Sequence, residues 1–544
     1  MAIFSELKKH QDMMDYCGKC GDCSSSGTQI TTAKRHVTKP CPVKNVLGFE
    51  AYDARGRILI LKKLMDEKLE TDDSILKWAY TCTGCGSCKE TCLAIEGGIN
   101  TPLLMEALRQ DFVNQKLKIE KHQEVLNSIL QNNNPYNEPK ETRSKILSGR
   151  KFNPNSEYLL FLGCTSSYRQ QNIALSTIEL LDNLGIEYSI LDQSEPCCGS
   201  ILKRYGYKNE FETIARKNLE LFKKNEIKKV IFPCAGCYRT FKIDYAELDN
   251  NSIQFYHLTE FLDQYLNEKS YKFKMKHHKK ISYHDPCHLG RHAGVYEAPR
   301  SLLKRIGNSN FIELDALRNY SHCCGAGGGV KSSDPDLAQK IAINRNEEAI
   351  EKGIEILVSA CPFCEKNLKD GLNGANLEIL DISEVLLRSI EKEMESQILD
   401  ESEYEIKIGK KYMKFLAKYP DIFSDLVKGS ILDFAIYVKL DDLEEEKPLC
   451  CFNVLRTENG IELKSGKADD PDLELAVSTE AVNKLVLNKT KSDYAKQFGI
   501  FYNEPDEEEG WIDFVLHKRT KTLIKMGYGK FAEEAGILED EDEI

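Results

Sequence analysis

Apolar positions recur with two different periods along the chain, and the period changes with position. Residues 54–70, ARGRILILKKLMDEKLE, place apolar side chains three or four positions apart, which predicts an amphipathic helix. Its apolar stripe consists of Ile58, Leu61, Leu64, Met65 and Leu69. From Tyr158 onward, short apolar runs with the length of strands alternate with helical segments, and from about Tyr404 a helix precedes strands of alternating polarity. The pattern predicts a multidomain protein with helical, α/β and α+β parts.

The α/β part contains an internal repeat. Each half has a strand, a single cysteine, a helix, an adjacent cysteine pair before a glycine, a helix, a strand and a C-x-x-C motif. The halves begin with YLLFLG (158–163) and KISYHDP (280–286). Such alternation implies parallel sheets, with the cysteines at the carboxyl ends of the strands. The basic run KFKMKHHKK (272–280) lies between the halves, and we interpret it as a solvated linker.

The last part differs from the rest in charge as well as in pattern. The chain carries a net charge of −12, and the residues from Glu401 to the end include 32 acidic and 20 basic side chains. The first 400 residues are therefore neutral overall. An acidic excess confined to one segment indicates a separate folding unit, and the charge gives no reason to expect nucleic-acid binding. The strands predicted for this part are LDFAIYVKL, LCCFNVLRT, GIELKSG, DLELAV and WIDFVLH.

Composition and the N-terminal residues predict a cytoplasmic protein. No apolar run approaches the roughly 20 residues that a membrane span needs. The first residues, MAIFSELKKHQDMM, lack the apolar segment of a secretory signal. We expect any membrane contact to occur through a partner. In a reducing compartment, 20 cysteines favour metal ligation over a disulfide scaffold.

Eight cysteines near the N-terminus have the spacing of ferredoxin-type cluster ligands. Four of them form the C-x₂-C-x₂-C-x₃-C run that holds [4Fe–4S] clusters, in which the fourth cysteine serves the other cluster of a pair. We therefore predict two cubane clusters, one held by Cys17, Cys20, Cys23 and Cys92, the other by Cys41, Cys82, Cys85 and Cys88. Leu93 stands where a proline usually follows the fourth cysteine. Zinc, which also accepts four thiolates, is the alternative.

The two repeated halves carry five cysteines each, more than zinc or one cubane needs. Adjacent cysteines cannot close an ordinary disulfide with each other. At a sharp turn, however, both thiolates of such a pair can hold one inorganic group. Gly199 and Gly325 follow the two pairs and permit such a turn.

At these motifs the sequence resembles a known family. The repeat is similar to the cysteine-rich CCG domains of heterodisulfide reductase, and the order of the parts resembles its fused catalytic subunit, in which a ferredoxin-type domain precedes two such domains. The stretches that carry the similarity are FLGCTSSYR, CAGCYRTFK, YHDPCHLGRHAGVYEAPR and HCCGAGGGV. The resemblance covers roughly residues 10–390. Related dehydrogenase subunits, such as the glycolate oxidase iron–sulfur subunit, share this layout.

The resemblance implies an enzyme with a noncubane [4Fe–4S] cluster in each CCG domain. The ligands would be Cys164, Cys197, Cys198, Cys234 and Cys237 in the first domain, and Cys287, Cys323, Cys324, Cys361 and Cys364 in the second. A disulfide substrate would be reduced to thiols between these clusters, with electrons relayed through the two cubanes.

The chain has no flavin or nicotinamide motif of its own, so the resemblance implies an electron-donor protein. The donor would be a flavoprotein, a ferredoxin, a hydrogenase or formate dehydrogenase module, or a cytochrome b subunit. One alternative is an electron-transfer iron–sulfur subunit of a flavoprotein dehydrogenase, either of the glycolate/lactate type or linked to an electron-transfer flavoprotein. A ligand-sensing or scaffold protein is the third hypothesis.

The last part resembles a different family. The segment ENGIELKSGKADDPDLELAVSTEAVNKLV is similar to the strand–turn–strand–helix region of sterol-carrier-protein-type domains, which enclose an apolar ligand between a sheet and helices. The resemblance implies binding of an acyl or lipid-like thiol, or docking of a partner, and the alternative is a structural or oligomerisation role. The expected parts are a ferredoxin-type domain (1–131), a linker (132–157), CCG domains (158–268 and 281–395), a sterol-carrier-like domain (404–536) and an acidic tail (537–544).

Other residues near the cysteines have less specific interpretations. We expect His284, His288 and His322 to hydrogen-bond with cluster sulfur or backbone, with proton donation to a leaving thiolate as the alternative. We expect solvated or structural roles for a further set, whose alternative is to neutralise anionic substrate groups: Arg169, Arg239, Arg291 and His292. GAGGGV (325–330) predicts close packing on a cluster. Cys450 and Cys451 lie in a predicted strand, so they face opposite sides, and we interpret them as core or surface thiols.

Overall fold

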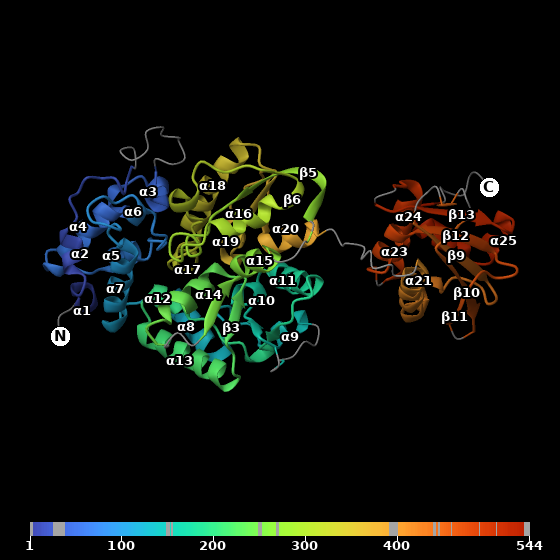
Figure 1. The fold of residues 1–544 in the computed structure, drawn as a ribbon, viewed down its shortest axis with the longest axis horizontal. Helices are drawn as coiled ribbons and strands as arrows, with labels where there is room; N and C mark the ends of the chain where they lie inside the picture. Colours follow the sequence, from blue (N-terminus) through green and yellow to red (C-terminus); the bar gives the residue numbers. More distant parts are fainter. Residues whose placement is uncertain are drawn as a thin grey trace. The chain divides into compact units, whose positions relative to one another are not determined.

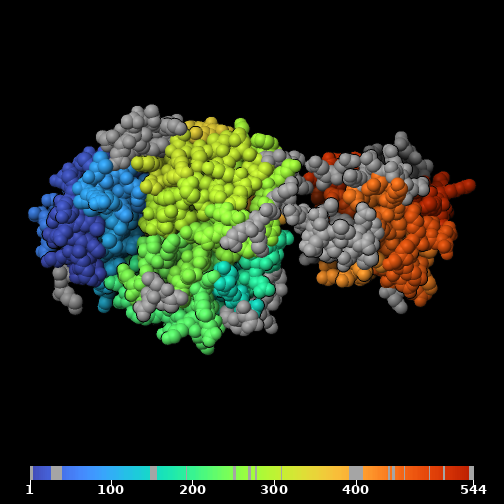
Figure 2. All heavy atoms as spheres, in the orientation of Figure 1, coloured from blue at the N-terminus to red at the C-terminus, as the bar shows by residue number. Residues whose placement is uncertain are grey.

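The computed structural model divides the chain into two compact units, residues 1–391 and 392–544 (Figures 1 and 2). It describes residues 4–537 except for 26–38, 148–152, 154–155, 249–252, 268–270, 272, 391–400, 439–441, 444–446, 459, 489 and 507–508. All but the first residue of the predicted acidic tail (537–544) lies outside the described residues. Among the helices described, none has the length and apolar character needed to span a bilayer.

The N-terminal part of the first unit is helical. Its main helices are α3 (Pro42–Leu47), α4 (Ala54–Met65), α5 (Asp73–Ala79), α6 (Ser87–Glu90), α7 (Thr101–Asn114) and α8 (Glu120–Asn132). Helix α4 begins where the Asp53 carboxylate accepts a hydrogen bond from the Gly56 N–H. Ile58, Leu61 and Leu64 are buried, as the apolar stripe predicts. Leu69 lies beyond the end of α4 and is 37% exposed, so its assignment to the stripe was wrong.

The segment interpreted as a linker contains ordered structure. Helix α9 (Glu141–Ile146) lies within it, and the buried Arg143 guanidinium forms a 2.9 Å ion pair with the buried Glu195 carboxylate. The proline-bearing, polar composition suggested a solvated connection. The ion pair instead holds this segment against the first repeat, because neither charge can be left unpaired in the interior.

Each half of the repeat forms a four-stranded parallel sheet. The first has the strand order β2-β1-β3-β4, from Tyr158–Leu160 (β1), Ser189–Ile190 (β2), Lys229–Phe232 (β3) and Gln254–His257 (β4). The second has the matching order β6-β5-β7-β8, from Phe273–Tyr283 (β5), Ile306–Phe311 (β6), Ile356–Ser359 (β7) and Glu378–Asp381 (β8). All strand pairs in both sheets are parallel, as predicted. The cysteine-bearing ends of β1 and β3, and of β5 and β7, are therefore neighbours.

Helices cover these sheets (Figure 1). In the first repeat they are α10 (Cys164–Tyr168), α11 (Gln171–Asn183), α12 (Ser200–Tyr205), α13 (Lys208–Lys224), α14 (Ala235–Arg239) and α15 (Leu258–Asn267). In the second they are α16 (Glu297–Lys304), α17 (Val330–Ser333), α18 (Pro335–Glu351), α19 (Pro362–Asp370) and α20 (Ile382–Ser389). The basic run 272–280 is not a linker, because residues 273–280 belong to strand β5, whose Phe273 pairs with Ile306 of β6.

The second unit has one mixed sheet with helices around it. Its strand order is β11-β10-β9-β12-β13, from Ile431–Tyr437 (β9), Cys450–Thr457 (β10), Gly460–Ser465 (β11), Leu473–Ser478 (β12) and Ile512–Leu516 (β13). The helices are α21 (Glu401–Lys418), α23 (Thr479–Leu485), α24 (Lys491–Asn503), α25 (Thr520–Lys525) and α26 (Tyr528–Glu534). All five predicted strands are present. Helix α21, the helix predicted from about Tyr404, ends at Lys418, two residues before Pro420.

Candidate metal centre

Five cysteines of the first repeat meet at the carboxyl end of its sheet. Cys164 begins helix α10 after strand β1, and Cys197 and Cys198 precede helix α12. Cys234 and Cys237 flank the start of helix α14 after strand β3. The Sγ atoms of Cys198 and Cys237 are 3.3 Å apart, and the Cys164 thiol contacts that of Cys197.

Buried polar groups hold these turns in place. The Glu195 carboxylate accepts hydrogen bonds from the backbone N–H groups of Leu162 (2.9 Å) and Gly163 (2.8 Å), so it ties the turn of Cys164 to the turn of Cys197. The Tyr245 hydroxyl donates to the Cys198 carbonyl over 2.9 Å. The turn geometry is therefore fixed by the protein itself.

The second repeat reproduces this arrangement. The Sγ atoms of Cys324 and Cys364 are 3.3 Å apart, and Cys323 contacts Cys287. His284 contacts the Cys324 thiol. Its ring nitrogen, Cys324 Sγ and Cys364 Sγ all lie within 4.8 Å of one another, which makes this group a candidate metal site in its own right.

The glycines after the cysteine pairs make the predicted sharp turns. Gly199 has φ +76° and Gly325 has φ +95°, both in the left-handed region that favours glycine. The Gly199 N–H donates to Cys197 Sγ (3.4 Å), and the Gly325 N–H donates to Cys323 Sγ (3.3 Å). A Cβ atom at Gly325 would lie only 2.7 Å from the Ala338 carbonyl oxygen. The CCG motif therefore places two thiols side by side at one turn and supplies a backbone donor to the first of them.

The eight N-terminal cysteines surround two neighbouring cavities. One is lined by Cys17, Cys20, Cys23, Cys88 and Cys92, and the other by Cys41, Cys82, Cys85 and Cys88. Each cavity contains one of the two four-cysteine sets predicted from the spacing, and Cys88 borders both. Burial raises the pKa of the Cys23 and Cys41 thiols to about 12.

The donor set fits iron–sulfur clusters. None of the 20 cysteines, all of which lie in the described ranges, forms a disulfide, although the sulfur atoms of two pairs are 3.3 Å apart. Neighbouring thiols and burial raise the pKa of Cys237 and Cys364 well above the usual value of a thiol, so a lone thiolate is costly at these positions. A bound cation supplies the missing positive charge and displaces the thiol protons.

A close interface joins the second cavity to the second repeat. The Cys85 and Cys323 thiols are in contact. The glycine-rich loop 325–329 lies against the backbone of Cys82 and Thr83, since a Cβ atom at Gly328 would be 2.1 Å from the Cys82 carbonyl oxygen. His292 Nε2 is 3.0 Å from the Gly84 carbonyl. The glycines thus serve close packing on a cysteine loop, and the packing of GAGGGV on a cluster stays a prediction.

A second interface joins the two repeats. The Cys234 and Cys361 thiols contact each other, and His257 Nε2 lies 3.1 Å from the Ala360 carbonyl. A Cβ atom at Gly236 would be 3.7 Å from His288 Nδ1. The two five-cysteine groups therefore face each other, with His288 beside them. Burial lowers the pKa of His288 to about 4, so its ring is neutral near pH 7.

Comparison with known proteins agrees with this architecture. The family model of the CCG cysteine-rich domain matches residues 158–242 and 281–369. Over 395 residues the chain is 34% identical to the D-type subunit of the dihydromethanophenazine:CoB–CoM heterodisulfide reductase of Methanosarcina mazei, covering 69% of this chain and 94% of that protein. The chain belongs to this family of heterodisulfide reductase subunits. It is a heterodisulfide reductase-like iron–sulfur oxidoreductase, and its CCG domains are iron–sulfur domains.

Other relatives of this heterodisulfide reductase-like chain have different names. The EtfAB:quinone oxidoreductase of Syntrophomonas wolfei is 28% identical over 70% of this chain and 58% of its own length. The probable iron–sulfur-binding oxidoreductase FadF of Bacillus subtilis is 30% identical over 57% of this chain and 46% of its own length. Proteins similar to this chain therefore carry names as different as heterodisulfide reductase and EtfAB:quinone oxidoreductase.

The remaining residues singled out in the sequence lie in varied places. Arg169 pairs with Glu138 at 2.7 Å and is partly exposed, whereas Arg239 is buried and pairs with Asp244 at 2.6 Å. Both have the structural role that we expected. Cys450 packs against the main core of the second unit and Cys451 against the opposite face of its sheet, as the strand alternation predicts.

Sequence reasoning missed a set of buried charges that joins the N-terminal part to the first repeat. Arg204 pairs with both Glu106 and Asp244, and Arg109 donates to the Cys82 carbonyl over 2.8 Å. The sequence signal is weak: Glu106 and Arg109 lie among the apolar positions Leu104, Met105, Ala107 and Leu108 of helix α7, and both are buried.

Proposed function

We propose that the chain holds two cubane and two noncubane [4Fe–4S] clusters. The cubanes would be held by the two four-cysteine sets that line the cavities, and each noncubane cluster by the five cysteines of one repeat. Three observations support this proposal. The 18 thiols lie in these four groups, Cys88 lines both cavities, and Gly199 and Gly325 make equivalent left-handed turns after the two cysteine pairs. When bound, such clusters supply one-electron transfer.

We propose that these sets form one electron path. Cys88 links the two N-terminal cavities, the Cys85–Cys323 contact links the second cavity to the second repeat, and the Cys361–Cys234 contact links the two repeats. The path starts at the exposed Cys20, where an electron-donor protein would dock. Electrons would therefore reach the second repeat before the first.

The reaction we propose at the end of the path is disulfide reduction. One disulfide, two electrons and two protons give two thiols, and the electrons come from the donor protein. The observation that carries this proposal is the contact of the two five-cysteine groups, because a protein that only relays electrons has no need of two such groups face to face. A second candidate, an electron-transfer subunit of a flavoprotein dehydrogenase, is favoured by the similarity to the EtfAB:quinone oxidoreductase.

An anaerobic assay with reduced viologen separates these two functions. We expect the full-length protein to oxidise two viologen radicals for each disulfide consumed, with the CoB–CoM heterodisulfide, glutathione disulfide and dioctyl disulfide as the panel. Each disulfide accepts two electrons, and each viologen radical supplies one. If viologen reduces the clusters but no disulfide supports turnover, the electron-transfer function replaces the proposed one.

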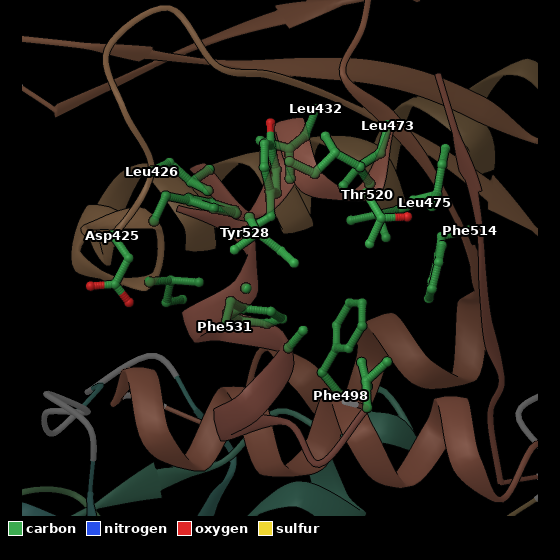
Figure 3. Close-up of a pocket in the computed structure, with 18 of the residues that line it drawn as sticks. Asp425, Leu426, Leu432, Leu473, Leu475, Phe498, Phe514, Thr520, Tyr528 and Phe531 are labelled. Atoms are coloured by element: carbon green, nitrogen blue, oxygen red, sulfur yellow. The ribbon is translucent and has the colours of Figure 1, made fainter. Parts of the chain in front are cut away.

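We further propose that the second unit binds an apolar ligand. It contains a cavity of about 180 Å³ between the sheet and the helices (Figure 3). The walls are almost entirely apolar: Leu426, Leu432, Phe434, Leu473, Leu475, Phe498, Phe514, Leu523 and Phe531. Leu516 (43% exposed) and Ile524 (38% exposed) border it on the solvent side. Apolar cavities of about 150 Å³ stay dry and bind small apolar molecules, so this one has room for a ring or a short alkyl segment.

Filling the cavity should abolish this binding. We expect Leu475→Trp to weaken binding of the fluorophore N-phenyl-1-naphthylamine by at least about tenfold, because the indole occupies the ligand's volume; this corresponds to about 1.4 kcal/mol. The control is Val515→Trp, which adds the same group at a 57% exposed position of strand β13. Fluorescence titration of the full-length protein, with octanethiol as competitor, measures both. Equal affinities in the two variants would contradict the cavity as the binding site.

A further inference from the structure

Arg291 lies at the interface between the second cavity and the second repeat. It belongs to the loop that follows Cys287, and its Nε donates to the Cys85 carbonyl over 2.8 Å. Its Nη1 donates to the carbonyl of Ser321, two residues before Cys323, and to that of Asn319 (3.3 Å). One guanidinium therefore ties the loop of a predicted cubane ligand to the loop of a predicted noncubane ligand.

The third nitrogen of this guanidinium has no partner within the described part of the chain. Nη2 is buried and makes no hydrogen bond there. Burial by itself lowers the pKa of Arg291, but the thiols of Cys85, Cys287 and Cys323 outweigh it and raise that pKa overall. The three thiols that act most strongly on the Arg291 charge are thus Cys85, which lines the second cavity, and Cys287 and Cys323 of the second repeat. A buried N–H donor left over beside thiols needs an acceptor.

We propose that Arg291 is a positioning residue for electron transfer from the cubane held by Cys41, Cys82, Cys85 and Cys88 to the noncubane cluster of the second repeat. This inference rests on the cluster assignments of the proposed function. The hydrogen bonds donated by Nε and Nη1, which together form a fork, fix the separation of the Cys85 loop and the loop that precedes Cys323. The spare Nη2 N–H and the guanidinium charge stabilise the added negative charge on the reduced clusters.

The physical basis is the cost of adding charge to a buried site. In the transfer, one electron leaves the cubane and arrives at the noncubane cluster, no bond forms or breaks, and Arg291 keeps its proton. A fixed cation beside both ligand sets stabilises the reduced form of each more than the oxidised form, and the low dielectric of the interior enlarges this effect. A solvent-exposed arginine of the same repeat, such as Arg388, has little effect on the cluster potentials because water screens its charge.

The test is a redox titration of the full-length, cluster-loaded protein followed by electron paramagnetic resonance. We expect Arg291→Met to reduce the equilibrium constant for reduction of the junction clusters about tenfold, which for one electron is a fall of 59 mV in midpoint potential. Arg291→Lys keeps the charge but cannot reproduce the fork. It should retain the wild-type potentials while cluster-to-cluster transfer, measured by rapid freezing after reduction, becomes slower. Arg388→Met is the matched control and should change neither quantity.

The outcomes distinguish the inference from the proposal on which it rests. Failure of the cluster assignment appears in the wild type, as missing iron or missing cluster signals. Unchanged potentials in Arg291→Met with full iron content would overturn the role of Arg291 alone. Loss of iron from both Arg291→Met and Arg291→Lys would also overturn it, because the residue would then serve only to hold the fold.

Discussion

Replacing Cys324 with alanine should abolish the proposed disulfide reduction while the two proposed N-terminal cubanes remain reducible. Cys324 is buried, its Sγ is 3.3 Å from that of Cys364, and it contacts His284, so no other side chain can take its place. Loss of groups that only support a metal ligand costs 10–100-fold. We therefore expect activity of the Cys324→Ala protein to fall below about one-hundredth of wild type. Cys198→Ala should do the same through the first repeat.

The measurement pairs turnover with spectroscopy. Viologen-dependent reduction of a disulfide reports the reaction, and dithionite-reduced spectra report the cubanes, whose proposed ligands lie in a different part of the chain. Cys451→Ala is the matched control, since it removes a thiol that packs in the second unit, which contains none of the proposed ligands. Wild-type turnover in Cys198→Ala or Cys324→Ala would remove that repeat from the reaction centre.

Gly328→Ala should prevent binding of the cubane proposed for Cys41, Cys82, Cys85 and Cys88, and with it the proposed electron supply to the repeats. The added Cβ would lie 2.1 Å from the Cys82 carbonyl oxygen and 2.7 Å from the Thr83 carbonyl carbon, so the loops must separate. The φ of +63° at Gly328 adds strain of about 1–2 kcal/mol. We expect iron to fall by about four atoms per chain, the content of one cluster.

A variant at a second glycine separates the effect of the steric collision from that of the backbone strain. Gly374 also has positive φ (+81°), but a Cβ atom there would meet no atom within 4 Å. Gly374→Ala therefore carries the backbone strain without the collision and should keep its full iron content and activity. Iron and acid-labile sulfide analysis of both variants, prepared anaerobically, is the measurement. A Gly328→Ala protein with wild-type iron would show that the loop contact is dispensable for cluster binding.

The sequence allowed prediction of the features that depend on local spacing. The parallel strands, their duplication and the position of cysteines at strand ends follow from short apolar runs that end at cysteines. The glycine turns at Gly199 and Gly325 follow from the steric limits of adjacent side chains. The five strands of the second unit were readable from their short apolar runs, although β9 and β12 are buried on both faces.

Features that depend on distant partners were not predictable in this way. The contact of Cys85 with Cys323 and the fork of Arg291 join segments far apart in the chain, and nothing near Arg291 in the sequence distinguishes it from a surface arginine. The start of strand β5 was missed because its residues 274–280 are mostly basic or histidine, which is typical of exposed segments. The buried ion pair of Arg143 and Glu195 was missed because the segment around Arg143 is polar and contains prolines, which is also typical of exposed segments.

The long-range junction at Arg291 has a consequence for biosynthesis. Arg291 and Cys85 are 206 residues apart, so the ribosome finishes one side of the junction long before the other. At about 5–20 residues per second, the interval is about 10–40 s. During that time the nascent thiols of Cys82, Cys85 and Cys88 lack the loops that later cover them, and they are open to oxidants and to competing zinc. The cubane proposed for these thiols is therefore covered only after the second repeat has been made, and we expect a host that keeps the thiols reduced during synthesis to yield more of the loaded protein.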